Sequence, residues 1–311
     1  MKKVHNAIVM KKNLFILIAA IIAISASAQT KRALVIGVSD YPKNGADSWE
    51  VIHGANDAEL IDTILKDQGF VTTKICNEAA TAEKIRKALN TLVKSCSAGD
   101  IVYLHFSCHG QPFEDLNGDE GKKDGWDESI VPYDAQKVFK KGKYKGQNHI
   151  IDDELHTYFQ MIRKRIGESG FVCVVVDACH AGGSSRGGNN SEDGDDDVFV
   201  RGTDTGFCLS GNRDFSPNPD KKGYFEIQEE SGLAHIAILE ACKSYESNYE
   251  IKDNGIYYGP LSFYVCKVLK KEKLLCSIDW ILKVKKLMNS DNRLTMQHMV
   301  YETTLKKYGD R

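Results

Sequence analysis

Two almost continuous apolar segments constrain the fold of this chain most strongly. They are residues 101–106 (IVYLHF) and residues 171–176 (FVCVVV). Segments as apolar as these are typical of strands in a parallel sheet, because such strands are buried on both faces. Segments with helical spacing of apolar residues separate the strand candidates. This alternation predicts an α/β fold, doubly wound, with a mostly parallel sheet and helices on both faces.

The remaining expected elements continue the same alternation. Further strands are expected at residues 33–36, 70–75 and 235–239, and helices are expected to begin near residues 56, 81, 152, 260 and 278. Thr81 is placed to cap the second of these helices. No internal repeat interrupts the order, so we expect one domain from residue 29 to residue 311.

The first 28 residues have the pattern of a secretory signal peptide. Two lysines precede the apolar residues 14–24, and small residues at 26–28 supply a cleavage site. The apolar segment is shorter than the roughly 20 residues that a membrane-spanning helix needs. We therefore expect an exported protein, periplasmic or secreted, without a stable membrane anchor. Either Met1 or Met10 can be the start.

Composition excludes several classes of protein. Hydrophobic residues at 42% and charged residues at 27% are ordinary globular values, which argue against a disordered chain. The chain has 41 basic and 43 acidic residues, and its net charge of -2 argues against a nucleic-acid partner. None of the nine cysteines forms a CxxC pair, so a zinc ribbon is not indicated.

The candidate catalytic residues directly follow the two apolar segments. Ligands of α/β sheets bind beyond the carboxyl ends of the strands, and these places read SCHG and DACHAGG. A cysteine near a histidine can become a nucleophilic thiolate, and the histidine can then pass a proton to a leaving amine. We therefore predict that His109 and Cys179 meet at one rim of the sheet. Gly110 and the small residues after Cys179 would let backbone amides face a substrate carbonyl.

These motifs, in this order and on these strands, resemble those of metacaspase-type cysteine peptidases of the caspase-like family. RALVIGVSDY resembles the opening strand of that fold, HGANDAELI its first helix, and HIAILEACKSYESNYE its closing strand. The resemblance covers about residues 31–290. It implies a dyad in which Cys179 is the nucleophile and His109 the general acid and base. It also implies oxyanion amides from Gly110 and Cys179, no cofactor for the chemistry, and a monomer.

Charge indicates the specificity. A pocket for a basic side chain needs carboxylates, and the resemblance places Asp57, Ser107 and Asp177 in such a pocket. We therefore predict protein or peptide substrates that are cut after Arg or Lys. Two alternatives stay open: Asp57 as a charge that favours the start of its helix, and Asp177 as the holder of a buried hydrogen bond. His53 lies near Asp57 in the sequence and is given no role.

A loop rich in carboxylates, between residues 114 and 127, raises the question of calcium. Oxygen ligands of this kind suit Ca²⁺, and the resemblance assigns ligand positions to Asp127, Asp152 and Asp153. A further family ligand falls near Arg186, where this chain has no acidic residue. The alternative is a solvated loop, with Asp152 and Asp153 at a helix start. Both interpretations remain open.

Two segments are candidates for self-cleavage: the Lys-rich residues 137–147 and the flexible residues 182–201. The second contains Arg186 and Arg201, and its acidic part, near residues 182–200, is expected to be a mobile loop. The cleaved bond is left open. The alternative function is a catalytically silent caspase-like binding or scaffold protein. The intact pair of His109 and Cys179 favours the enzyme.

Overall fold

The computed structural model describes most of the chain after the predicted signal peptide. The described residues are 29–118, 125–180, 198–203, 205–209, 213–214, 223, 225, 227 and 229–305. The predicted signal peptide and most of the predicted mobile loop lie outside them. No helix among these residues is long and apolar enough to cross a membrane.

A six-stranded sheet, in the order β13-β10-β7-β3-β1-β2, forms the centre of the molecule. Its strands are β1 (Lys31–Gly37), β2 (Val71–Cys76), β3 (Ile101–Ser107), β7 (Phe171–Asp177), β10 (His235–Glu240) and β13 (Val300–Thr303). All neighbours pair in parallel except β13, which is antiparallel to β10. The predicted mostly parallel sheet is confirmed, and β3 and β7 are neighbours.

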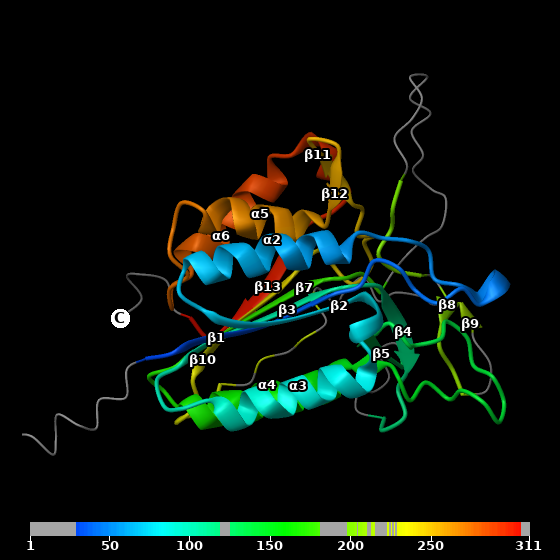
Figure 1. The fold of residues 1–311 in the computed structure, drawn as a ribbon, viewed down its shortest axis with the longest axis horizontal. Coiled ribbons are helices and arrows are strands. Elements are labelled where there is room, and N and C mark those ends of the chain that lie inside the picture. Colours follow the sequence, from blue (N-terminus) through cyan, green and yellow to red (C-terminus); the bar gives the residue numbers. More distant parts are fainter. Residues whose placement is uncertain are drawn as a thin grey trace, which may run out of the picture.

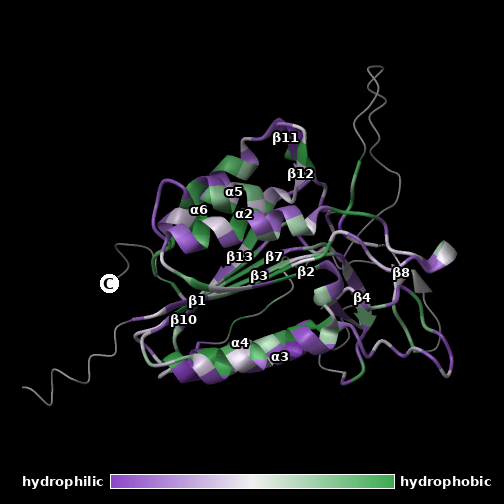
Figure 2. Cartoon of the chain, in the orientation of Figure 1, coloured by the Kyte–Doolittle hydropathy of each residue, from purple (hydrophilic) through white to green (hydrophobic). Residues whose placement is uncertain are grey.

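Helices cover both faces of this sheet (Figure 1). The helices on one face are α2 (Gly54–Asp67), α5 (Pro260–Leu269) and α6 (Asp279–Asn289), and those on the other are α3 (Ala82–Ser95) and α4 (Asp152–Ile166). Apolar strands lie between helices whose surfaces alternate between apolar and polar residues (Figure 2). Each face has its own buried apolar cluster, because successive strand residues point to opposite faces.

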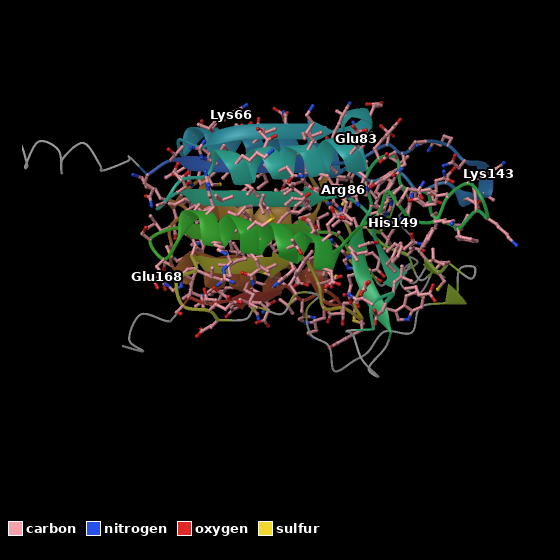
Figure 3. All side chains as sticks on the ribbon, turned by 90° about the horizontal axis from the view of Figure 1, so that it is seen from below. Lys66, Glu83, Arg86, Lys143, His149 and Glu168 are labelled. Atoms are coloured by element: carbon pink, nitrogen blue, oxygen red, sulfur yellow. The ribbon has the colours of Figure 1, made fainter. Side chains whose placement is uncertain are left out.

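Local signals in the sequence explain where α3 begins and how it is held. The hydroxyl of Thr81 accepts a hydrogen bond from the backbone N–H of Lys84 at 3.4 Å, so the predicted cap is confirmed. Helices α3 and α4 lie side by side (Figure 3). Arg86 of α3, labelled there, forms an ion pair with Glu154 of α4 at 2.7 Å. Both predicted helices are therefore confirmed.

Two glycines bring the start of α2 against the sheet. A Cβ atom on Gly37 would lie 2.3 Å from the carbonyl oxygen of Gly54. A Cβ atom on Gly54 would lie 2.3 Å from the carbonyl oxygen of Ser107. Only glycine permits so close an approach. The first turn of α2, which carries Asp57, is therefore held beside the end of β3.

Several short strands were not predicted. The polar stretch after β3 contains β4 (Gly110–Glu114) and β5 (Trp126–Ile130), which form an antiparallel sheet with β6 (Ile150–Ile151). Two-stranded sheets form from β8 (Thr205–Gly206) with β9 (Arg213–Asp214) and from β11 (Ile251–Asp253) with β12 (Ile256–Tyr258). The β11–β12 turn is Asn254-Gly255, with φ values of 49° and 81°. This pair is a strong hairpin signal, whereas the other short strands carry too few apolar residues to stand out.

Candidate active site

The ends of β3 and β7 form the rim on which the candidate catalytic residues lie. Ser107 pairs with Asp177 at the last position of the two strands. His109 and Cys179 each follow two residues later, so the same rim carries both. Both are almost completely buried, with exposed fractions of 1% for His109 and 0% for Cys179.

The imidazole of His109 is fixed by two aromatic rings and a backbone carbonyl. It stacks on Trp49 with ring centroids 5.0 Å apart and meets Tyr41 at 5.3 Å. Its Nε2 lies 2.9 Å from the carbonyl oxygen of Glu50, which can only accept, so the neutral ring carries its proton on Nε2. Burial lowers the pKa of His109 to about 4, and the bond to Glu50 opposes this shift. At pH 7 the ring is therefore neutral.

The other ring nitrogen is the one available for chemistry. Nδ1 of His109 is buried and has no hydrogen-bond partner in the part of the chain that the structure covers. The thiol of Cys179 donates to the carbonyl oxygen of Glu246 at 3.0 Å. Proton transfer from Cys179 to His109 therefore requires the thiol to turn away from Glu246.

The predicted oxyanion site contains a carbonyl of the chain itself. The carbonyl oxygen of Arg201 accepts hydrogen bonds from the backbone N–H of Gly110 at 3.0 Å and from that of Cys179 at 3.1 Å. These are the two predicted oxyanion donors. A Cβ atom on Gly110 would lie 2.5 Å from the carbonyl oxygen of Cys179, so a larger residue would push the two donors apart.

The three predicted pocket residues converge on the side chain of Arg201, which is fully buried. Its guanidinium lies 2.8 Å from Oδ2 of Asp57 and donates to Oγ of Ser107 at 2.5 Å. It also donates to the backbone carbonyl of Asp177 at 3.1 Å. Glu250, which was not predicted, accepts two further hydrogen bonds from the guanidinium at 2.8 and 3.0 Å. The result is a buried acidic pocket filled by an arginine.

The two acidic pocket residues differ in how they contact Arg201. The carboxylate of Asp177 lies 3.7 Å from the guanidinium and accepts hydrogen bonds from Ser262 at 2.6 and 2.7 Å and from Asn248 at 2.8 Å. The alternative interpretation of Asp177, as the holder of a buried hydrogen bond, therefore describes part of its surroundings. Asp57 contacts the guanidinium directly.

The electrostatics of the pocket favour a cation. Burial raises the pKa of Asp57 to about 7; Arg201 lowers it, and Asp177 and Glu250 raise it further. Burial disfavours the charged form of Arg201, but the three carboxylates more than offset this and raise its pKa. A cation in this pocket thus stabilises the ionised carboxylates.

Backbone pairing holds the segment that carries Arg201. We call residues 198–202 the strap. The N–H of Arg201 donates to the carbonyl of Asn248, and the N–H of Glu250 donates to the carbonyl of Phe199, both at 3.0 Å. Val200 forms an antiparallel bridge with Tyr249. A mobile loop was predicted up to residue 200, but residues 199 and 200 are paired here.

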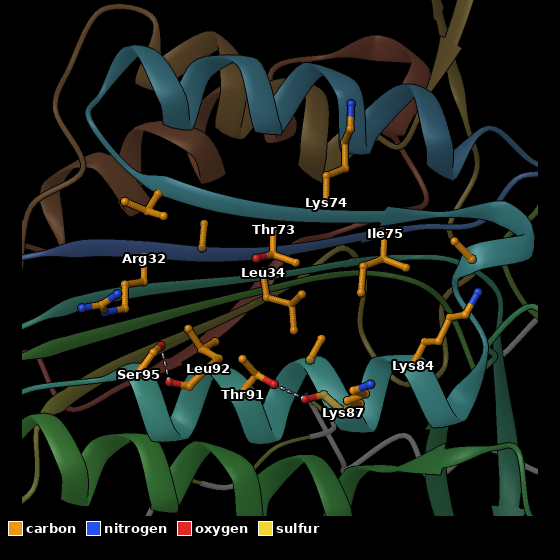
Figure 4. A pocket seen from close by; sticks show the side chains of 14 residues that line it. Arg32, Leu34, Thr73, Lys74, Ile75, Lys84, Lys87, Thr91, Leu92 and Ser95 are labelled. Carbon is orange, nitrogen blue, oxygen red and sulfur yellow. Dashed lines mark hydrogen bonds between the residues drawn. The ribbon is translucent and has the colours of Figure 1, made fainter.

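An open groove lies elsewhere, at the edge strand β2 beside α3 (Figure 4). Its volume is about 450 Å³, and Leu34, Lys74 and Leu92 are among its lining residues. None of the predicted site residues lines it. At the catalytic rim, in contrast, the strap occupies the space in front of Cys179.

Comparison with known proteins agrees with this arrangement. The model of the caspase domain of the C14 peptidases matches residues 30–308. The chain belongs to the caspase domain family. The prediction of a metacaspase-type, caspase-like family is thereby confirmed.

Individual caspase-domain proteins give the degree of similarity. The chain is 26% identical over 275 residues to metacaspase-1 of Mycosarcoma maydis, which covers 79% of this chain and 64% of that protein. It is 32% identical over 163 residues to metacaspase-7 of Arabidopsis thaliana, which covers 49% of this chain and 35% of that protein. The chain thus spans less than two thirds of these relatives. A crystal structure of a Geobacter sulfurreducens protein shares the fold, with a TM-score of 0.59, 18% identity and coverage of 90% and 95%.

The calcium positions suggested by the metacaspase resemblance do not form a cluster here. Asp127 lies buried in β5, and Asp152 and Asp153 lie in the first turn of α4. Asp153 accepts a hydrogen bond from the side chain of Asn117 at 2.7 Å. Among the residues that the structure describes, no group of three or more His, Cys, Asp or Glu side chains is arranged to hold a metal ion. The acidic residues at 119–124 and 192–197 lie outside them, so calcium binding stays a prediction.

Three participants were missed or given no role by sequence reasoning. Arg201 was noted only as a basic residue, and Glu250 was not singled out. His53, which was left without a role, lies 2.5 Å from Oε2 of Glu250 through its Nδ1. Neither Glu250 nor His53 adjoins a long apolar strand, and the two are joined only by the tertiary fold. No signal in the sequence alone connects them.

Proposed function

We propose that this protein is a cysteine endopeptidase that cleaves peptide bonds after Arg or Lys. One observation carries the proposal: Arg201 is held at both ends. Its carbonyl faces the amides of Gly110 and Cys179, and its side chain fills the pocket of Asp57, Ser107 and Asp177. A substrate residue just before the cleaved bond requires both contacts at once.

The geometry supports the following chemistry. Sγ of Cys179 attacks the carbonyl carbon, and its proton passes to Nδ1 of His109. The resulting oxyanion accepts hydrogen bonds from the amides of Gly110 and Cys179. The carbon–nitrogen bond then breaks, and His109 returns the proton to the leaving amine. Water hydrolyses the thioester with His109 as base, while the carbonyl of Glu50 keeps the ring oriented.

The same proposal assigns the bond between Arg201 and Gly202 as the site of self-cleavage. In the intact chain it is the carbonyl oxygen of Arg201 that accepts hydrogen bonds from the amides of Gly110 and Cys179. A Cβ atom on Gly202 would lie 2.4 Å from the carbonyl oxygen of Cys179, so the chain leaves the site directly past the nucleophile. Before cleavage the strap excludes other substrates, and after cleavage it can leave. The intact chain is therefore a zymogen in this proposal.

The test combines intact-mass measurement with peptide hydrolysis. We expect the chain to be cut after Arg201, and Cys179→Ala to remain whole, with a loss of about 10³-fold or more in activity. Arg201→Lys should still be cut at this bond, whereas Arg201→Gln should not. Arg186→Gln is the matched control and should be processed like the wild type.

Reporter amides of peptides ending in Arg, Lys or Asp test the pocket. Hydrolysis of the Arg and Lys peptides, and not of the Asp peptide, is the expected result. Cleavage only after Asp would overturn the pocket. A folded protein that cleaves neither itself nor any of the peptides would instead support the catalytically silent binding or scaffold protein.

We further propose that calcium stimulates the enzyme, that it is exported and that it is a monomer. These three points rest on the metacaspase resemblance and on residues that the structure does not describe. Calcium should accelerate self-cleavage in the wild type, but not in Asp127→Asn. Equal rates of self-cleavage with calcium and with chelator would favour the alternative, a solvated acidic loop that binds no calcium. Secretion from a bacterial host should yield a chain that begins at Gln29. Analytical sedimentation should give the mass of a single copy of the chain.

A further inference from the structure

We infer that the protein has a second specificity site, an aromatic subsite formed by His53 and Tyr257. It binds the side chain of the substrate residue that lies two positions before the Arg or Lys at the cleaved bond. The inference rests on the proposed function, because it treats the strap as a bound substrate. It extends that function by naming the substrate class: chains with an aromatic residue at this position.

The pairing of the strap places Phe199 beside the acidic pocket. Phe199 and Arg201 both form backbone hydrogen bonds with the segment that contains Asn248 and Glu250, and Val200 lies between them. In an extended chain, alternate side chains point the same way. The side chains of Phe199 and Arg201 therefore enter the protein together.

Two rings receive the side chain of Phe199. Its ring meets that of His53 edge to face, with centroids 4.6 Å apart at 85°, and that of Tyr257 at 4.8 Å and 72°. The rings of His53 and Tyr257 stack on each other at 5.0 Å and 24°, which makes them one continuous wall. Edge-to-face contacts at these distances favour aromatic rings over aliphatic side chains of similar size.

Ring contacts distinguish Phe199 from its neighbours in the strap. The side chain of Val198 is 65% exposed, and Phe199 and Val200 are both partly buried, but Phe199 is the one whose ring packs against His53 and Tyr257. The strap is therefore recognised chiefly at Phe199 and Arg201. This pattern predicts substrates of the form aromatic, any residue, then Arg or Lys.

The aromatic subsite and the acidic pocket share one carboxylate. Oε1 of Glu250 accepts from Arg201 at 2.8 Å, and Oε2 lies 2.5 Å from Nδ1 of His53. His53 thus holds the carboxylate that contacts the basic side chain. A substitution of His53 would disturb both sites, whereas Tyr257 contacts the aromatic side chain without touching this carboxylate.

The test compares two peptides that differ only in this residue. The probes are the reporter amides of acetyl-Phe-Val-Arg and acetyl-Ala-Val-Arg, assayed with the processed enzyme. We expect kcat/KM to be about tenfold higher for the Phe peptide, because the ring adds both apolar burial and edge-to-face contacts. The difference should lie mainly in KM, since the subsite is remote from the cleaved bond.

Variants of Tyr257 separate this inference from the proposed function. Tyr257→Ala should bring the ratio of the two peptides close to one, and Tyr257→Phe, which keeps the ring, should preserve it. A ratio near one in the wild type, with both Arg peptides cleaved, would overturn the subsite and leave the Arg specificity standing. A ratio that survives in Tyr257→Ala would also overturn it. Failure to cleave either peptide would overturn both proposals.

Discussion

The two halves of the candidate active site are held by different forces. His109 and Cys179 follow strands β3 and β7, in which every residue is buried, and aromatic rings pack against the imidazole. The strap is held instead by the ion pairs of Arg201, by backbone hydrogen bonds to residues 248–250 and to the catalytic rim, and by the ring contacts of Phe199. Apolar burial fixes the catalytic half, and charge fixes the Arg201 end of the strap.

In the proposed function, this difference describes how the site would exchange Arg201 for a substrate. Removing one partner of a buried ion pair is costly, about 3–5 kcal/mol, because the other charge is left without compensation. Replacing Arg201 with the Arg of another chain restores the same contacts. We therefore expect the acidic pocket to favour exchange of one basic residue for another over remaining empty.

Among the changes that test this comparison, the largest effect is expected from Asp57→Asn, which removes a pocket charge and keeps His109 and Cys179. Loss of one partner of the buried pair should reduce kcat/KM for Arg peptides about 10²–10³-fold. Self-cleavage after Arg201 should slow as well. Kinetics on the Arg peptide and intact-mass time courses measure the two effects.

Asp62→Asn is the matched control, because Asp62 is also a buried carboxylate of α2. It pairs with Lys66 at 2.7 Å and with Thr72 at 2.5 Å, not with Arg201. It should affect thermal stability more than specificity. Equal losses of activity in the two variants would mean that α2 acts only through the stability of the fold.

The second effect is a pH dependence confined to substrate binding. The pKa of Asp57 is raised to about 7, and a bound cation favours its ionised form. This value includes the Arg201 guanidinium, which lowers it, so the carboxyl of a pocket without a cation titrates above pH 7. KM for Arg peptides should therefore fall as the pH rises above 7, by up to about tenfold per pH unit, because binding of the cation releases a proton. Below pH 7 the carboxyl is protonated both with and without the peptide, and KM levels off.

Measuring KM and kcat between pH 5 and pH 9 tests this assignment. Asp57→Asn should flatten the KM profile, because it removes the titrating group. A decrease in kcat toward low pH, as large as the increase in KM and measured at saturating peptide, would contradict the assignment to Asp57. The titrating group would then belong to the chemical step.

The main sheet could be predicted from the sequence because burial on both faces leaves a clear pattern. Strands β3 and β7 are long apolar runs, and α3 has both its cap at Thr81 and its apolar spacing. The edge strand β13 and the small sheet of β4 and β5 are short and carry few apolar residues. Their pairing is decided by partners far away in the sequence, which no local pattern records.

The catalytic half of the site was predictable for the same reason. His109 and Cys179 directly follow recognisable strands, so the α/β topology alone places them at one rim. Glu250 and the strap lie on loops, and the pairing of Phe199 with Glu250 depends on the folded chain. The motifs therefore placed His109 and Cys179 at one rim, and the metacaspase resemblance suggested three residues that lie around Arg201. Neither indicated Arg201 as the residue between them, nor the rings around Phe199.

The smallest expected effect tests how apolar packing at the catalytic rim sets the pKa of His109. Trp49 stacks on His109 and helps to keep it from water, and burial lowers the pKa of this histidine to about 4. Trp49→Ala should hydrate the ring and move its pKa up toward the ordinary value of about 6.5. The neutral ring is the form that accepts the thiol proton, so kcat should fall between pH 5 and pH 6 and change little at pH 8. Profiles of kcat at saturating Arg peptide measure this shift, with Trp49→Phe as the variant that keeps an aromatic cover. If kcat of Trp49→Ala depends on pH in the acid range as kcat of the wild type does, then other groups, and not this stacking, set the pKa of His109.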